Sequence, residues 1–277
     1  MTISKLLLIL NYLFLLGWWS VINILQLQDG VGATFFSLGF GIYTFFLPVL
    51  FVYLLLKSTK TYNSLNAILA FLGVSMFGVG TLFWFYYDFV LESEVLFPSM
   101  SHFFYLFQFP FVVLSFIMLV NQSKSQTYNL SILGIFYIAV CILSYIFSTF
   151  FLRTTDLLGF IEMYFPLESF SVFLITLYIF LASSKNRLDI ISTSYYIYYL
   201  LSGLVFWVIA DMSFFYMNLT SEFTSASIPD IFYVTACFLI MYSYSSLVDR
   251  GDRLGIFVSD EQVFMQKTSY YKPISLN

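Results

Sequence analysis

The chain has 277 residues, of which 60% are hydrophobic and only 9% are charged, and its formal net charge is −4. A water-soluble fold of this length cannot bury so much apolar surface, and a chain in lipid satisfies its own backbone hydrogen bonds by forming helices. The basic residues are spread thinly over several segments and form no basic patch, so the sequence excludes nucleic acid as a partner.

Eight apolar runs predict an all-α, polytopic membrane protein, because each run is about long enough to cross a bilayer as a helix. The helices together form one domain over residues 1–247, and residues 248–277 are expected to form a short cytoplasmic tail. Met1–Leu16 could also be read as a signal peptide, although no small-residue cleavage site follows it. In chain order the runs are Leu6–Leu25, Ala33–Leu56, Asn66–Tyr87, His102–Val120, Asn129–Leu152, Leu167–Ser183, Ser194–Met217 and Pro229–Leu247.

The basic residues predict the orientation of these helices. Short loops rich in Lys and Arg stay on the cytoplasmic side of a membrane. With eight helices, only Arg153 falls on the outer side, so both termini are predicted to be cytoplasmic, in a cell membrane such as a bacterial inner membrane. The residues on the predicted cytoplasmic side are Lys5, Lys57, Lys60, Lys124, Lys185, Arg187, Arg250, Arg253, Lys267 and Lys272.

Small residues gather in the third run, where Gly73, Ser75, Gly78 and Gly80 lie close together. Small side chains let neighbouring membrane helices approach closely, so this interval is expected to serve packing. Cys141 and Cys237 lie inside apolar runs and are expected to pack as small hydrophobic side chains.

An internal repeat is the strongest architectural signal. Four residues of the third helix recur in the seventh at one constant offset, and Phe97–Tyr105 matches Ala226–Tyr233 at a slightly larger offset. We therefore expect two parallel four-helix repeats, about residues 1–125 and 126–247, related by a pseudo-twofold axis along the membrane normal. The first set of pairs is Gly80 with Gly203, Phe83 with Phe206, Trp84 with Trp207, and Asp88 with Asp211.

The same region carries a family resemblance. An Asp at the end of one helix precedes an acidic loop and then a Pro-Ser start to the next helix, with a Phe-Tyr pair and a Phe-Pro pair further on. This pattern resembles the eight-helix membrane sensor region found at the N-terminus of many bacterial diguanylate cyclases, phosphodiesterases and sensor kinases. The matching residues, between about Gly80 and Leu247, are Asp88, Pro98, Ser99, Phe104, Tyr105, Phe109, Pro110, Tyr164, Phe165, Pro166, Leu167, Glu168, Asp211, Asp230, Ile231, Phe232 and Tyr233.

The resemblance implies a sensor that binds a small or lipophilic ligand from the outer side. The chain departs from the family pattern at His102 and Glu168, where the family favours Asp. Only a short segment, Asp249–Asn277, follows the last helix, which is far less than an output domain needs. The resemblance therefore implies that the chain acts through a separate cytoplasmic signalling protein.

Ionisable residues in or beside the helices are the candidate ligand-binding groups, because a charge in a membrane helix is expensive unless it faces a polar interior or water. We expect a polar ring at the outer side of an aromatic-lined, outward-open cavity. Each member also has a structural interpretation, as a helix cap, a dipole partner or an interfacial hydrogen-bonding group. No catalytic group, metal or cofactor is expected. The candidates are Asp88, His102, Glu168, Asp211 and Asp230, with Trp84 and Trp207.

A transporter or a membrane-embedded lipid enzyme is the alternative function. A transporter needs polar residues near the middle of the bilayer, whereas the sequence places the acids near one face, which favours sensing. A zinc hydrolase is disfavoured because the chain has one His, and a retinal protein is disfavoured because every Lys lies outside the predicted helices.

Overall fold

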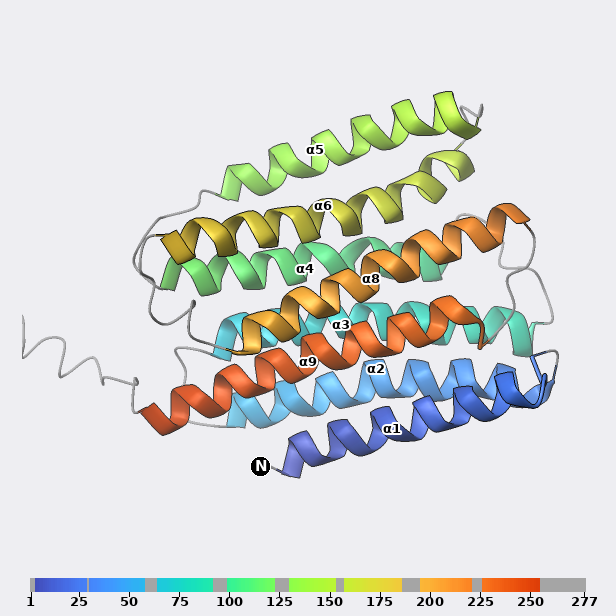
Figure 1. Cartoon of the computed structure of the whole chain (residues 1–277), viewed down its shortest axis with the longest axis horizontal. Coiled ribbons are helices and arrows are strands. Elements are labelled where there is room, and N and C mark those ends of the chain that lie inside the picture. The colour runs from blue at the N-terminus through green and yellow to red at the C-terminus, as the bar shows by residue number, and fades with distance from the viewer. Residues whose placement is uncertain are drawn as a thin grey trace, which may run out of the picture.

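The computed structural model describes residues 3–28, 30–57, 64–91, 99–122, 130–152, 157–185, 195–220 and 226–254. These residues form eight α-helices, which confirms the predicted all-α class, and consecutive helices run in opposite directions (Figure 1). The π-helices η1 (Tyr86–Val90) and η2 (Ser148–Leu152) extend α3 and α5. The α-helices are α1 (Ile3–Ile24), α2 (Val31–Lys57), α3 (Ser64–Phe85), α4 (Met100–Gln122), α5 (Leu130–Phe147), α6 (Leu157–Lys185), α8 (Tyr195–Thr220) and α9 (Ile228–Leu254).

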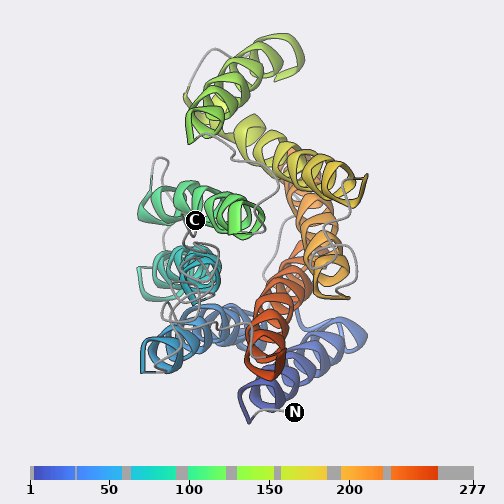
Figure 2. The same ribbon diagram turned by 90° about the vertical axis from the view of Figure 1, so that its left-hand side faces the viewer.

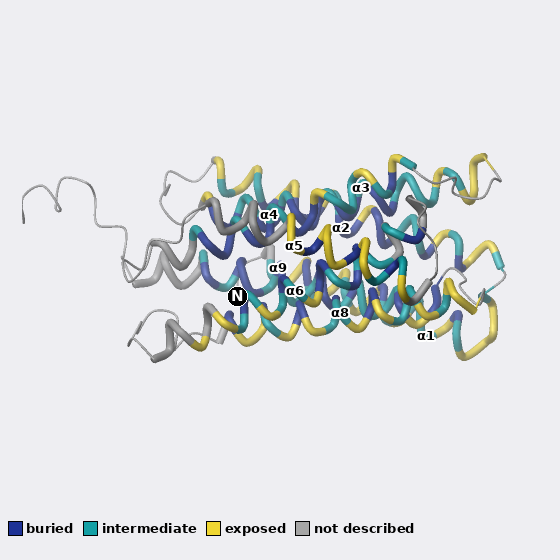
Figure 3. The backbone as a smooth tube through the Cα atoms, turned by 90° about the horizontal axis from the view of Figure 1, so that it is seen from above, coloured by how far each residue is buried: buried dark blue, intermediate teal, exposed yellow. Residues whose placement is uncertain are grey.

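The chain is a polytopic membrane protein. Within the described residues, six helices are long and apolar enough to cross a membrane, namely α1 to α4, α8 and α9. Helices α5 and α6 contain shorter apolar segments, Ile138–Phe150 and Met163–Tyr178. Exposed positions line the outer faces of the bundle, whereas buried positions gather inside it (Figure 3). Many of the exposed side chains are large and apolar, as expected for a surface that lipid covers.

The predicted start of the sixth helix is wrong. Helix α6 begins at Leu157, well before the predicted Leu167, and it contains Pro166 in its interior. Proline is tolerated inside a membrane helix because neighbouring groups can satisfy the freed backbone, so Pro166 does not mark a helix start here. Helix α9 also continues past the predicted domain boundary at residue 247, to Leu254.

The helices form two layers (Figure 2). Helices α2, α3 and α4 pack side by side in chain order, and α1, α9, α8 and α6 form the facing layer. Helix α5 packs on α6 at one edge. The layers meet where α3 contacts α9, α4 contacts α6 and α2 contacts α1, so the core lies between helices of both halves of the chain.

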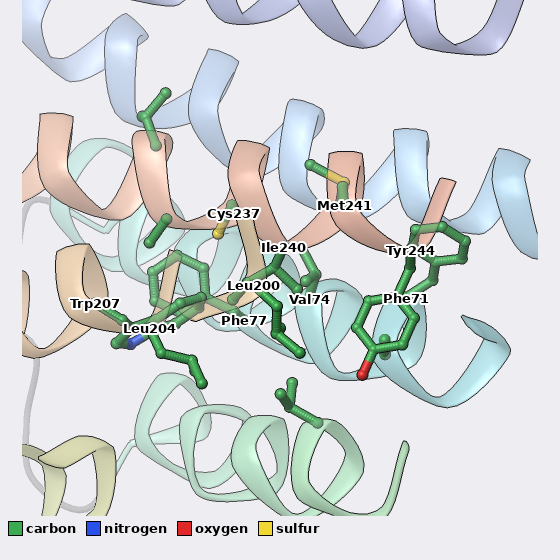
Figure 4. Close-up of a cluster of buried hydrophobic side chains, with 14 of the residues drawn as sticks. Phe71, Val74, Phe77, Leu200, Leu204, Trp207, Cys237, Ile240, Met241 and Tyr244 are labelled. Atoms are coloured by element: carbon green, nitrogen blue, oxygen red, sulfur yellow. The ribbon is translucent and has the colours of Figure 1, made fainter. Parts of the chain in front are cut away.

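The centre of the core is aromatic and tightly packed. Figure 4 shows Phe77 of α3 beside Trp207 of α8, with side chains of α9 completing the cluster. The predicted packing role of the small residues is confirmed, because a Cβ added to Gly78 would lie 2.5 Å from the backbone nitrogen of Phe45 on α2. Of the two cysteines, Cys237 packs in the core as expected, whereas Cys141 is exposed on α5.

Gly73 of α3 and Gly203 of α8 hold the same place at their helix interfaces. A Cβ added to Gly73 would lie 2.7 Å from the Gln108 carbonyl oxygen, and one added to Gly203 would lie 3.2 Å from the Ala236 carbonyl oxygen. Gln108 and Ala236 are separated along the chain by the same number of residues as Tyr105 and Tyr233, which end the two matching segments of the predicted repeat. We call this separation the α4–α9 offset. We call the separation of the two glycines the α3–α8 offset. It differs from the prediction, in which the counterpart of Gly203 is Gly80.

A serine on α4 and a serine on α9 repeat these offsets. The Ser115 hydroxyl donates to the Asn66 carbonyl at 2.5 Å, and the Ser243 hydroxyl donates to the Tyr196 carbonyl at 2.7 Å. The two serines are separated by the α4–α9 offset, and their two acceptors are separated by the α3–α8 offset. These contacts therefore match α3 with α8 in a register that differs from the predicted one by about two helical turns.

Candidate functional site

Asp211 lies deeper in the bundle than predicted. Helix α8 continues past it to Thr220, a rise of about 13 Å, and so extends beyond the predicted end at Met217. The side chain of Asp211 is only 5% exposed, and the Tyr233 hydroxyl of α9 donates to its Oδ1 at 2.5 Å. Ser169 of α6 lies within hydrogen-bonding reach of the same carboxyl group. Three helices therefore meet at this carboxyl group.

Helix α8 also carries two buried polar atoms that lack a hydrogen-bond partner among the described residues. Within the described part of the chain, neither Asp211 Oδ2 nor Trp207 Nε1 has a hydrogen-bond partner. The Ser169 hydroxyl has a single proton to donate, and it lies 3.2 Å from the Pro166 carbonyl oxygen. A buried polar group without a partner costs about 1–3 kcal/mol, so this pair is an expensive feature of the core.

Trp207 is a core residue and does not line an outward-open cavity as predicted. It is 2% exposed, and its ring contacts Phe77 at 4.9 Å, Phe109 at 5.3 Å and Tyr233 at 5.8 Å between ring centroids. Trp207 and Asp211 are four residues apart, so they share one face of α8. The indole on that face contacts helices of both layers, and the carboxyl group contacts α9 and α6.

The expectation that Asp88 points into the bundle is wrong. Asp88 lies in η1 and is exposed, whereas its predicted counterpart Asp211 is buried. A carboxylate at the end of a membrane helix is stable when it meets water, which explains its exposure. Trp84, one helical turn earlier, is half-buried and contacts His102 at 6.3 Å and Phe214 at 6.2 Å between ring centroids.

His102 lies in the first turn of α4 and makes the local contact that its spacing suggests. Its Nδ1 is 2.6 Å from the Ser99 hydroxyl, which precedes the helix. The ring is half-buried and stacks near Phe165 of α6 at 6.5 Å. The interfacial, hydrogen-bonding interpretation of His102 is therefore supported.

Asp230 makes the structural contact expected of a helix start. The Ser227 backbone N–H donates to Asp230 Oδ2 at 3.0 Å, which is one of the two bonds of a capping box. The second bond does not form, because the Ser227 hydroxyl has no partner among the described residues. Asp230 and His102 are separated by the α4–α9 offset and occupy the same position in their helices.

Glu168 does not lie at a helix start, because α6 begins several turns before it, at Leu157. It is fully buried, and the Tyr164 hydroxyl donates to its Oε1 at 3.2 Å. The dipole interpretation of Glu168 is therefore wrong. Glu168 lies inside the bundle because α6 begins at Leu157, whereas Pro166 suggested that the helix begins next to Glu168.

The structure brings some of the predicted site residues together and separates others. Asp211 and Trp207 share one cluster, His102 and Trp84 contact each other nearer the helix ends, and Asp88 is exposed. The outer polar ring is thus not formed as predicted, since Asp88 lies outside it. The sequence singled out Tyr233 only as part of the Phe-Tyr motif and did not identify it as a partner of Asp211.

Within the described residues, no three His, Cys, Asp or Glu side chains lie close enough to hold a metal ion. Comparisons of the chain with protein-family models, with curated proteins and with solved structures found no match. The geometry of the Asp211 cluster is therefore the basis for a functional proposal.

Proposed function

We propose that this chain is a membrane-embedded, sensor-like protein that binds a small ligand at Asp211 and acts through a separate cytoplasmic protein. The observation that carries the proposal is the pair of buried atoms without partners among the described residues, Asp211 Oδ2 and Trp207 Nε1. They are a hydrogen-bond acceptor and a donor one turn apart in an aromatic core. A ligand with a cationic or donor group would satisfy the carboxyl group, and its apolar part would lie against aromatic faces.

A structural role explains only part of this cluster. The hydrogen bond from Tyr233 to Asp211 ties α9 to α8, and that role needs an acceptor but not a carboxyl group. A neutral Thr or Asn would accept the same bond without the cost of an ionisable group in the membrane. The carboxyl group at Asp211 therefore supports a binding role in addition to the structural one.

The proposed orientation has both termini in the cytoplasm. The start of α1 and the end of α9 lie at the same end of the bundle (Figure 1), and α2 and α6 both end with a lysine at that end. Reporter fusions at Lys60, Lys124 and Lys185 should read cytoplasmic, and fusions at Glu92 and Glu222 should not. Of these positions, only Lys185 belongs to the described residues. A cytoplasmic signal from Glu92 would overturn the orientation.

We also propose that the chain arose by duplication of a four-helix unit, with residues of α3 and α8 matched at the α3–α8 offset. The glycine and serine contacts of the two helix pairs support this match. The arrangement of two layers, in which α2, α3 and α4 face α6, α8 and α9 in reverse order, is also what a pseudo-twofold axis would produce (Figure 2).

Transport is the second candidate function, and the depth of two carboxyl groups favours it. Glu168 and Asp211 are both buried and lie well inside their helices, whereas the sequence placed the acids near one face. A transporter would move its substrate across sealed proteoliposomes, and a sensor would bind without flux. Flux that is lost in Asp211→Asn would favour transport over sensing.

The binding proposal can be tested with hexylamine as the probe. We expect hexylamine to raise the thermal unfolding temperature of the purified wild-type protein and to have a much smaller effect on Asp211→Asn, because the amide carries no negative charge and binds an ammonium group more weakly. Asp88→Asn is the matched control, since Asp88 is exposed and should be dispensable. An equal response of the wild type and Asp211→Asn would show that the site lies elsewhere.

A further inference from the structure

The interface of α3 with α4 contains a second pair of a partly buried tyrosine with a buried polar side chain. The Tyr105 hydroxyl of α4 lies within hydrogen-bonding reach of Thr81 on α3. Thr81 is buried, and its own hydroxyl donates to the Phe77 carbonyl at 3.1 Å. This pair resembles that of Tyr233 with Asp211, except that a neutral side chain replaces the carboxyl group.

The spacing of the two pairs is the same as that of the packing contacts. Tyr105 and Tyr233 are separated by the α4–α9 offset, and Thr81 and Asp211 are separated by the α3–α8 offset. The glycine and serine contacts of these helices have the same two offsets. Thr81, rather than Asp88, therefore occupies the place in the first half that Asp211 occupies in the second.

Other polar groups extend the Thr81 pair along α4. Ser101, Tyr105 and Gln108 are spaced by four and three residues, so they share one face of the helix. Ser101 and Gln108 are buried, and neither the Ser101 hydroxyl nor Gln108 Oε1 has a hydrogen-bond partner within the described residues. We call Thr81, Tyr105 and Gln108 the neutral subsite, and Trp207, Asp211 and Tyr233 the acidic subsite.

Phe77 joins the two subsites. The centroid of its ring is 5.2 Å from that of Tyr105, 5.2 Å from that of Tyr233 and 4.9 Å from that of Trp207. The two tyrosine rings can therefore be no further apart than twice the first of these distances. Phe77 and Trp207 are themselves separated by the α3–α8 offset and lie side by side in the core (Figure 4).

We propose that the site is bipartite and takes an amino alcohol, with an amine at the acidic subsite, a hydroxyl at the neutral subsite and an apolar body against Phe77. The inference rests on the proposed function, because it assumes that Asp211 binds a ligand. The acidic subsite offers a carboxyl oxygen to the amine, and the neutral subsite offers only uncharged donors and acceptors, which suit a hydroxyl.

Four matched probes test this division, namely hexylamine, 1-hexanol, 6-amino-1-hexanol and 1,6-diaminohexane, each titrated calorimetrically into the purified protein. One additional neutral hydrogen bond should tighten the binding of 6-amino-1-hexanol about fivefold relative to hexylamine. The diamine should gain nothing over hexylamine, because its second ammonium group would meet an uncharged subsite. Equal affinity for hexylamine and the amino alcohol would overturn the bipartite site.

Tyr105→Phe removes one hydroxyl from the neutral subsite with little change in volume. It should abolish the preference for the amino alcohol over hexylamine. Thr81→Asp places a carboxyl group in the neutral subsite and should reverse the preference, so that the diamine binds more tightly than the amino alcohol. If Thr81→Asp does not fold, Tyr105→Phe alone decides the matter.

The two levels of the proposal fail in different ways. If Asp211→Asn binds hexylamine as well as the wild type does, the proposed function is wrong. If Asp211→Asn weakens hexylamine but Tyr105→Phe retains the amino-alcohol preference, then Asp211 binds an amine and the neutral subsite plays no part.

Discussion

The pair α3–α4 and the pair α8–α9 use the same backbone contacts to present different chemistry. In both, a glycine lies against a carbonyl oxygen of the next helix and a serine hydroxyl donates to the start of the preceding one. At the centre, Phe77 and Thr81 in the first pair correspond to Trp207 and Asp211 in the second. The contacts that set the helix spacing are thus shared, whereas the polar groups next to the tyrosines differ.

This difference shows which residues carry packing and which carry specificity. In the first pair the side chain within hydrogen-bonding reach of the tyrosine hydroxyl is Thr81, which carries no charge. In the second pair it is Asp211, a carboxyl group whose second oxygen has no partner among the described residues. The carboxyl group beside the tyrosine is therefore found only in the α8–α9 pair, and the following substitutions measure how different the two pairs are.

The largest effect is expected from the glycines. A methyl group at Gly73 would lie 2.7 Å from a backbone carbonyl oxygen, whereas at Gly203 the nearest atom, on the Ile240 side chain, would be 3.0 Å away. Gly73→Ala should therefore lower the free energy of unfolding by about 3 kcal/mol, and Gly203→Ala should lower it by less. Denaturant unfolding in detergent micelles measures both. Gly17→Ala is the control, because no atom lies within 4 Å of the added methyl group.

The two tyrosines should differ next. Tyr233→Phe removes a hydrogen bond to a carboxyl group and should destabilise the protein by about 2 kcal/mol, whereas Tyr105→Phe removes a bond between neutral groups and should cost about 1 kcal/mol. The same unfolding assay applies, with the exposed Tyr216 changed to Phe as the control. A larger loss from Tyr105→Phe would contradict the assignment of the stronger bond to the α8–α9 pair.

The helix starts give a smaller contrast. Asp230→Ala removes a carboxyl group that accepts the Ser227 backbone N–H and faces the positive end of α9, and should cost about 1 kcal/mol. His102→Ala removes a contact with the Ser99 side chain instead, and should cost less. Thermal unfolding curves recorded in parallel would test the order. Equal losses would mean that the charge at position 230 adds nothing to the cap.

The smallest effects should be equal. Ser115→Ala and Ser243→Ala each remove an interhelical hydrogen bond to a helix carbonyl, which is worth about 0.6 kcal/mol in a membrane protein. Their unfolding free energies should agree with each other, and the double variant should show the sum of the two losses. A large loss from only one of them would argue against equivalent interfaces.

Local sequence patterns predicted the limits of most helices well, including those of α2 and α4, which contain Pro48 and Pro110, but they misplaced the start of α6. Helices α1 and α2 begin and end close to the predicted limits, whereas α6 begins at Leu157 instead of Leu167. Proline usually ends a helix because it has no backbone N–H to donate and its ring clashes with the preceding turn. In a membrane bundle this penalty is met by neighbouring groups, so Pro166 gives a false boundary. That error placed Glu168 at a helix start instead of in the core.

The sequence by itself determined that the chain is an all-α, polytopic membrane protein, because its apolar runs have the length of membrane helices and a helix satisfies its own backbone in lipid. It also supplied the α4–α9 offset. Only the tertiary structure supplied the α3–α8 offset, under which the proposed duplication matches Thr81 rather than Asp88 with Asp211. The predicted and observed registers of α3 with α8 differ by about two helical turns, so both place the same face of α8 towards its neighbour. The helical periodicity of the sequence therefore cannot distinguish the two registers. The contacts of Gly73 and Ser115 with neighbouring helices make the choice, because close packing permits only one axial register.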